Sequence, residues 1–190
     1  MVSQRIYLSP PNIGAAEIAR VSSALESGWV APVGPELTGF EADVASFVDV
    51  DSAVALSSGT AAIQLGLQGL DVKPGSTVLC PTLTFGATAF AIVHAGAIPV
   101  FVDSEDVSWN LDPRILRAAL VERAATGQLP AAIVTVDLFG RPCDYAPILA
   151  AAAEFEIPVL IDAAEALGAT YRSQPAGSVG DAAIFSFNGN

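Results

Sequence analysis

The stretch Ala131–Ile161, AAIVTVDLFGRPCDYAPILAAAAEFEIPVLI, decides the fold. It begins and ends with short apolar runs, 131–136 and 158–161, whose composition is typical of strands buried on both faces. Between them, residues 145–155 form a longer apolar segment that favours a helix. Strand, helix and strand in this order predict a βαβ unit, which joins two parallel strands of one sheet.

The same alternation extends in both directions from this unit. Asp112 followed by Pro113 predicts a helix start, because an acidic N-cap and a proline at the first helical position are typical of helix N-termini. The fold class is therefore α/β, a mostly parallel sheet with helices on both faces. Residues 17–27 and 36–47 read as helices that precede the first strand, so we expect a helical segment over 1–50 and the sheet domain over 51–190. The expected strands are 52–56, 77–80, 98–102, 131–136, 158–161 and 182–187, and the expected helices of the sheet domain are 60–70, 87–95, 113–125 and 145–155.

Composition excludes several classes of protein. The formal net charge is −12, with Lys73 and seven scattered arginines as the basic residues, so nucleic-acid binding is not expected. The apolar runs fall short of the length that a membrane-spanning helix needs, and the N-terminus does not resemble a signal peptide. Charged residues make up only 15% of the chain, which suggests that part of its surface is covered by a partner subunit or by further sequence. With Cys80 and Cys143 read as buried thiols, we expect a cytoplasmic protein.

The candidate functional residues follow the strands, because ligands bind beyond the carboxyl ends of the strands in open α/β sheets. Residues 57–61, SSGTA, lie between an expected strand and a helix, where backbone N–H groups and the helix dipole can bind a phosphate. An ordinary helix cap by Ser58 is the alternative. Phe85 follows the next strand and could either stack on a flat ligand or pack in the core.

Carboxylates follow two later strands. Asp162 could hold a cationic group of a ligand or cap the next turn, and Glu165 would share a face with it if the segment is helical. Asp137 could serve in a turn, at a helix entry or in ligand contact. A zinc site is not expected, since His94 is the single histidine and reads as a helix-end residue.

Taken together, these stretches resemble the DegT/StrS-type nucleotide-sugar aminotransferases, which use pyridoxal phosphate (PLP). The resemblance rests on the order of many short motifs rather than on any single one. They are Leu8–Pro11, Ser27–Val30, Gly34–Pro35, Phe40–Glu41, Ser58–Ala62, Pro81–Phe85, Pro99–Asp103, Asp162–Gly168, Gly180–Asp181 and Ser186–Asn190.

The resemblance implies the aspartate-aminotransferase-like fold and a role for each site residue. Gly59, Thr60 and Ala61 would hold the cofactor phosphate, with Ser186 adding a second hydroxyl. Phe85 would stack on the pyridine ring, and Asp162 would pair with the ring nitrogen and keep it protonated. Glu165 matches a position that lies close to the cofactor.

The family also implies parts that the sequence does not contain. The lysine that attaches the cofactor follows the segment that matches Asn188–Asn190, and the sequence ends at Asn190. We therefore expect the N-terminal half of a longer protein, with an incomplete PLP domain and without the C-terminal small domain. The resemblance further implies a homodimer in which two subunits share the active site. Many relatives have histidine where this chain has Asp137, which leaves the substrate contacts of that loop open.

The function implied is transfer of an amino group, with glutamate as donor, to a keto carbon of a UDP- or dTDP-linked deoxy sugar. Ala31–Pro32 and Phe187–Asn190 resemble most closely the branch that aminates UDP-4-keto-6-deoxy-N-acetylhexosamines. A histidine at position 191 would instead indicate a PLP-dependent sugar dehydratase. A chain that truly ends at Asn190 would indicate a non-catalytic fragment or dimerisation module. An NAD-binding domain is disfavoured, because the glycine fingerprint GxGxxG is missing.

Overall fold

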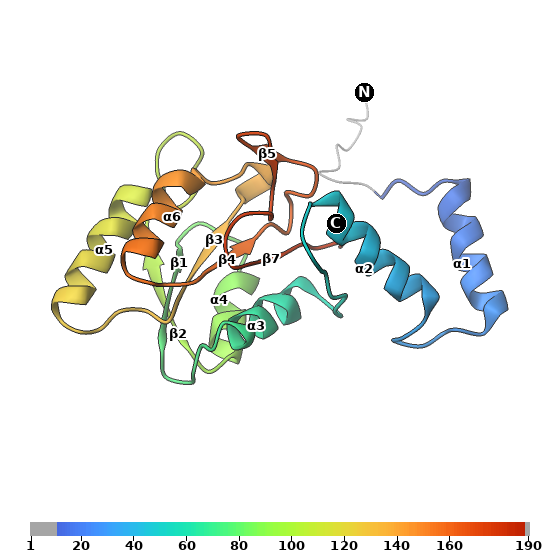
Figure 1. Cartoon of the computed structure of the whole chain (residues 1–190), viewed down its shortest axis with the longest axis horizontal. Coiled ribbons are helices and arrows are strands. Elements are labelled where there is room, and N and C mark those ends of the chain that lie inside the picture. The colour runs from blue at the N-terminus through green and yellow to red at the C-terminus, as the bar shows by residue number, and fades with distance from the viewer. Residues whose placement is uncertain (1–10, 189–190) are drawn as a thin grey trace, which may run out of the picture. The chain divides into compact units, whose positions relative to one another are not determined.

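The computed structural model describes residues 11–188, and the chain divides into two compact units (Figure 1). Of the described residues, 11–47, 51–55 and 187–188 form the first unit, and 48–50 and 56–186 form the second. The predicted boundary at residue 50 lies close to this division, but the assignment of the two parts as domains stays a prediction. The predicted motifs that involve residues 1–10 and 189–190 lie outside the described residues.

A parallel sheet forms the centre of the second unit. Among the described residues its five strands are β1 (Thr77–Pro81), β2 (Ile98–Val102), β3 (Ala132–Val136), β4 (Val159–Asp162) and β7 (Ala182–Ile184), in the order β2-β1-β3-β4-β7. All four neighbouring pairs are parallel, so their carboxyl ends lie at the same edge. The strand order reverses beside β1, and this switch point is where ligands bind in open α/β sheets.

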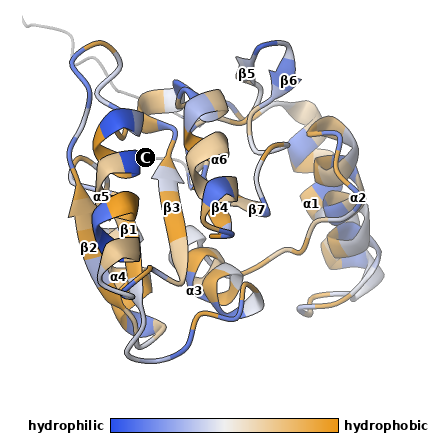
Figure 2. Ribbon diagram, turned by 60° about the vertical axis from the view of Figure 1, so that its left-hand side comes forward, coloured by the Kyte–Doolittle hydropathy of each residue, from blue (hydrophilic) through white to orange (hydrophobic). Residues whose placement is uncertain are grey.

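Helices cover both faces of this sheet, as predicted (Figure 1). Leu79, Ile133 and Ile161 pack on one face in a core that includes residues of α5 (Pro113–Ala125) and α6 (Tyr145–Glu154). The alternate residues Val78, Val134 and Leu160 pack on the other face with residues of α3 (Gly59–Gly69) and α4 (Ala87–His94). Because side chains alternate across a strand, β1, β3 and β4 each contribute to both cores and are mostly hydrophobic (Figure 2).

Local sequence explains where the helices start. Asp112 caps α5, accepting from the Arg114 N–H at 2.7 Å, and Pro113 occupies the first turn. Ser58 caps α3, accepting from the Ala61 N–H at 3.1 Å. His94 ends α4, followed by Gly96 in the left-handed conformation (φ +79°), as the sequence predicts.

The first unit contains α1 (Ala15–Ser27) and α2 (Pro35–Phe47), which match the two predicted helices. The strand expected at 52–56 is wrong: residues 53–56 have no regular structure, and the Ala55 N–H donates to Glu41 Oε1 at 2.8 Å. Within the described residues no strand pairs with this segment, and a lone strand has no ladder to satisfy its backbone.

Two short elements follow β3 and β4 without having been predicted. Residues Leu138–Gly140 form a 3-10 turn, η1, and a hairpin joins β5 (Thr170–Tyr171) to β6 (Gln174–Pro175). The hairpin turn consists of Arg172 and Ser173, both with positive φ. These residue types give little turn signal, since the usual two-residue hairpin turns contain Asn or Gly.

Candidate functional site

A buried carboxylate lies at the centre of the site. Asp162 is the last residue of β4 and is 6% exposed. Its Oδ2 accepts from the Thr88 hydroxyl at 2.7 Å, and its Oδ1 accepts from the Ala164 N–H at 3.3 Å. Burial raises the pKa of Asp162 above its ordinary value, and the Thr88 hydrogen bond acts in the opposite direction by stabilising the ionised form. Such a carboxylate is suited to pair with a cationic group.

The first turn of α3 meets the end of β7 at the same edge of the sheet. A Cβ on Gly59 would lie 3.6 Å from the Ser186 Cβ, so helix and serine are in contact. The N–H groups of Gly59 and Thr60 belong to the first helical turn and have no acceptor within the helix. Together with the Ser186 and Thr60 hydroxyls they offer donors to an anion. Ser58 also caps the helix, so the segment can both cap α3 and offer donors to a phosphate.

Phe85 is not a core residue, because its side chain is 81% exposed. It precedes α4, and its carbonyl accepts from the Thr88 N–H at 3.2 Å. The turn therefore joins an exposed aromatic ring to the residue whose hydroxyl contacts Asp162. The alternative of a packed Phe85 is wrong, since the core of this face is filled by Ala91 and Ile92 of α4.

Glu165 is exposed and lies in a turn rather than a helix. Successive turns, Ala166 N to Ala163 O and Ala169 N to Ala166 O, form this segment, so it is not helical and Glu165 does not share a helical face with Asp162. Glu165 Oε2 accepts from the Phe139 N–H at 2.8 Å, which ties this turn to η1. Gly140 sits beside it with φ +80°, and a Cβ there would lie 2.9 Å from the Glu165 carbonyl oxygen.

The site residues predicted from the sequence lie at one sheet edge of the second unit. Their contacts run through the elements that follow β1, β4 and β7, and Ser186 N donates to Ala164 O at 3.4 Å. Sequence reasoning missed Thr88, although it lies one helical turn after Phe85. Its partner Asp162 lies 74 residues further along the chain, so no local signal could have revealed it.

The role of a second buried carboxylate, Asp137, was left open by the sequence. Asp137 is 1% exposed, and its Oδ1 accepts from the Cys143 N–H at 2.9 Å and from the Tyr145 hydroxyl. Burial raises its pKa, as it raises the pKa of the Cys143 thiol. Asp137 therefore stabilises the turn between β3 and α6. Both cysteines are buried and free, as expected.

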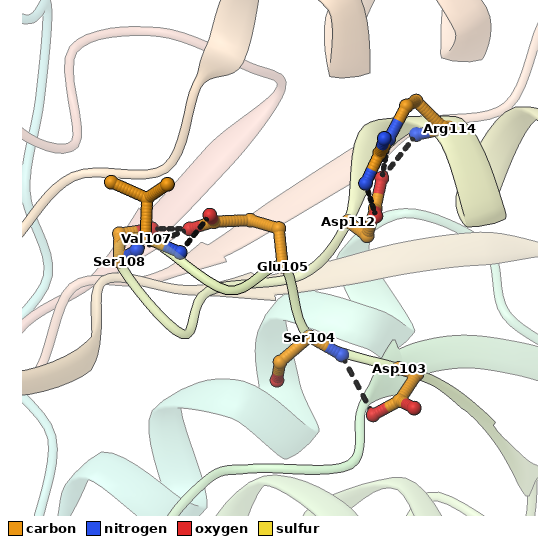
Figure 3. Close-up of polar contacts among 7 residues, drawn as sticks. All are labelled: Asp103, Ser104, Glu105, Val107, Ser108, Asp112 and Arg114. Atoms are coloured by element: carbon orange, nitrogen blue, oxygen red, sulfur yellow. Dashed lines mark hydrogen bonds and ion pairs between the residues drawn. The ribbon is translucent and has the colours of Figure 1, made fainter.

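Asn110, which sequence reasoning did not select, also holds the η1 loop, through residues on either side of Phe139 and Gly140. Its side chain is 2% exposed; Oδ1 accepts from the Leu138 N–H at 3.1 Å, and Nδ2 donates to the Arg141 carbonyl at 2.8 Å. Asn110 lies on a loop between β2 and α5 that has its own polar contacts (Figure 3). Glu105 accepts from the Val107 N–H at 2.6 Å and from the Ser108 N–H at 2.6 Å, which closes this loop on itself.

Neither a metal centre nor a membrane span is found among the described residues. Within 11–188, no three His, Cys, Asp or Glu side chains are grouped in a way that could hold a metal ion. Over the same residues, the helices lack the length and apolar character needed to cross a membrane.

Comparisons with known proteins agree on one family. The profile of the DegT/DnrJ/EryC1/StrS aminotransferase family matches residues 11–190. EpsN from Bacillus subtilis is 44% identical over 187 residues, which are 98% of this chain and 48% of the relative. The GDP-perosamine synthase of Caulobacter vibrioides is 38% identical over 98% of this chain and 48% of its own length. The structure of Spr1654 from Streptococcus pneumoniae in its PLP form matches with a TM-score of 0.89 and 33% identity, covering 98% of this chain and 50% of that one. The chain thus spans about half the length of the curated relatives it matches.

Proposed function

The chain belongs to the DegT/DnrJ/EryC1/StrS aminotransferase family, and from this premise we propose that the full protein is a PLP-dependent sugar aminotransferase. It transfers an amino group from a donor amino acid to the keto carbon of a nucleotide-linked deoxy sugar, and the donor leaves as its keto acid. The observation that carries this proposal is the Asp162 carboxylate, buried at the carboxyl edge of the sheet and held by Thr88.

The residues present fit PLP. A buried carboxylate with a raised pKa gains from a nearby cation, and the protonated pyridine nitrogen is such a cation. At the other end, the first turn of α3 and the Ser186 hydroxyl provide the neutral donors that a phosphate needs. Gly59 lies in contact with Ser186, so the cradle is formed by backbone and small side chains. When bound, PLP supplies an electron-withdrawing ring that stabilises negative charge at the reacting carbon.

Each residue then has a defined task. Asp162 keeps the ring nitrogen protonated, and Thr88 orients the Asp162 carboxylate. Phe85 has an exposed ring that would stack on the pyridine. The N–H groups of Gly59 and Thr60, in the first turn of α3, would hold the phosphate together with Ser186, and Ala61 lies in the same turn with its N–H donating to Ser58. Glu165 holds η1 by accepting from the Phe139 N–H, and by its position in the family motif it would lie close to the cofactor.

The substrate and the assembly belong to the same proposal. We propose glutamate as donor and a UDP- or dTDP-linked 4-keto-6-deoxy sugar as acceptor; the GDP sugar in the name of the Caulobacter relative makes GDP the nucleotide to compare. We also propose a homodimer in the cytoplasm. The exposed side chains of Ile18, Val21 and Leu25 share one side of α1 and support a covered surface in the full protein. The division into a helical segment 1–50, a large domain from 51 and a later small domain is part of this proposal.

The test is borohydride reduction of the full protein loaded with PLP, followed by peptide mapping of the segment after Ser186. A pyridoxyl group on a lysine that directly follows Asn190 supports the aminotransferase. An unmodified histidine there refutes it in favour of a dehydratase. Incubation with glutamate and each of the UDP-, dTDP- and GDP-linked keto sugars then identifies the acceptor by the amino sugar formed.

A further inference from the structure

Phe139 combines a rare backbone conformation with an exposed aromatic ring. Its φ and ψ are +52° and +32°, in the left-handed region that bulky residues rarely adopt. Its side chain is 72% exposed, although the residue before it, Leu138, is buried. Strained residues of this kind persist where the surrounding structure holds them in place, and they gather at functional sites.

Hydrogen bonds from three directions hold the Phe139 loop. Glu165 accepts from the Phe139 N–H at 2.8 Å, and Asn110 binds both the Leu138 N–H and the Arg141 carbonyl. Asp137 accepts from the Cys143 N–H and closes the far end. The ring of Phe139 is thus fixed at its base while its faces remain open.

The charges around this loop indicate what kind of group the ring receives. Glu165 is a carboxylate in direct contact with this loop, because it accepts from the Phe139 N–H, and the Arg141 guanidinium donates to the Val107 carbonyl at 3.3 Å. A phosphate or carboxylate is disfavoured beside the Glu165 carboxylate. A neutral face with C–H groups, such as one side of a pyranose ring, suits an exposed aromatic ring in this position.

We propose that Phe139 is a specificity-determining residue whose ring stacks on the neutral C–H face of the sugar in the nucleotide-sugar substrate. This inference rests on the proposed function, because it names a contact of the acceptor substrate at that same site. It distinguishes the acceptor from the donor, since an amino acid such as glutamate has no comparable face. Removal of the ring should therefore weaken binding of the sugar substrate and leave the half-reaction with the amino donor almost unchanged.

The test compares Phe139→Ala and Phe139→Gly in the full protein loaded with PLP. Trp109→Ala is the matched control, because Trp109 is also exposed and has φ +66° but lies on the loop that carries Asn110. Calorimetry measures the affinity for the amino sugar product, and stopped-flow absorbance measures the donor and sugar half-reactions separately. We expect both Phe139 variants to lose about ten-fold or more in sugar affinity and in kcat/KM of the sugar half-reaction, in the range of aromatic stacking contacts. The donor half-reaction and the Trp109 variant should stay within two-fold of wild type.

The Phe139→Gly variant separates the effect of losing the ring from the effect of backbone strain, because glycine adopts the left-handed conformation without strain. If Phe139→Gly retains the wild-type sugar affinity, or if both half-reactions fall equally, the inference is wrong. It is also wrong if the variants alter the oligomeric state with unchanged sugar affinity, which would assign the ring to a subunit contact. Wild-type protein that binds PLP but none of the nucleotide sugars refutes the proposed function itself, and the inference with it.

Discussion

Replacement of Thr88 by valine tests whether its hydroxyl stabilises the ionised Asp162. Valine keeps nearly the same shape, so the change removes one hydrogen bond of 2.7 Å from a fully buried position. A hydrogen bond to a charged group contributes about 1.5–3 kcal/mol. The other hydrogen bond to the Asp162 carboxylate, from the Ala164 N–H, is long at 3.3 Å and offers little compensation. We expect the free energy of unfolding of the cofactor-free protein to fall by about 2 kcal/mol at pH 8.

The expected pH dependence follows from the raised pKa of Asp162. The folded state binds this proton more tightly than the unfolded state, whose carboxyl titrates at about 3.9, so stability falls as pH rises from the unfolded pKa through the folded pKa. Without the Thr88 hydrogen bond the folded pKa is higher still, and the fall is larger. The difference between variant and wild type should therefore be small below about pH 4 and largest above the folded pKa.

Urea unfolding of the wild type, Thr88→Val and Thr88→Ser at several pH values measures this difference. Serine keeps the hydroxyl and should retain most of the stability. Thr84→Val is the matched control, because the Thr84 and Thr88 hydroxyls lie 2.8 Å apart and Thr88→Val also removes that contact. The reasoning fails if Thr88→Val destabilises the protein equally in an Asp162→Asn background, or equally at pH 4 and pH 8.

Three further substitutions test the loop beside the site. Gly140→Ala should destabilise the fold by more than about 1 kcal/mol, since φ is +80° and the new Cβ would meet the Glu165 carbonyl. Gly127→Ala is the control for backbone strain alone, because Gly127 has φ +67° and a Cβ there would lie in open space. Equal losses of stability in thermal unfolding of the two variants would contradict the clash. Asn110→Ala should cost about 2 kcal/mol in urea unfolding and speed hydrogen exchange at residues 138–141, and unchanged exchange would show that Asn110 does not hold the loop. The wild type should lose stability as pH rises through the raised folded pKa of Asp137, and Asp137→Asn should remove this loss. The prediction is wrong if the free energy of unfolding of the wild type does not change with pH in this range, or if the variant shows the same loss.

Much of the fold could be predicted because its signals are local. The apolar run at 98–102 matches β2, and the helix predicted at 113–125 from Asp112 and Pro113 matches α5 as the structure has it. The segment at 52–56 has the same apolar character but no strand beside it among the described residues. A strand depends on its neighbours for its hydrogen bonds, so apolar composition alone cannot establish that one forms.

The site could be predicted only where a residue type is informative by itself. Asp162 and Phe85 stand out because a carboxylate and an aromatic ring follow buried strands. Thr88 and Asn110 were missed since their partners are 74 and 28 residues away in sequence, and no local pattern links them. Glu165 was placed at the site, but through a turn rather than a helix, because hydrogen bonds to the carbonyl groups of Ala163 and Ala166 replace helical pairing.

The two buried carboxyl groups act on opposite faces of the sheet, and this follows from the alternation of side chains along the strands. Asp162 continues the side of Leu160, toward α4 and Thr88, whereas Asp137 continues the side of Ile133, toward Tyr145 of α6. Their backbones are nevertheless joined, with the Asp137 N–H donating to the Asp162 carbonyl at 3.0 Å. The negative charge of Asp162 raises the pKa of Asp137 in addition to burial. The sheet edge thus presents Asp162 on the face of α3 and α4, where the phosphate donors and Phe85 also lie, whereas Asp137 on the opposite face supports the turn that carries Phe139.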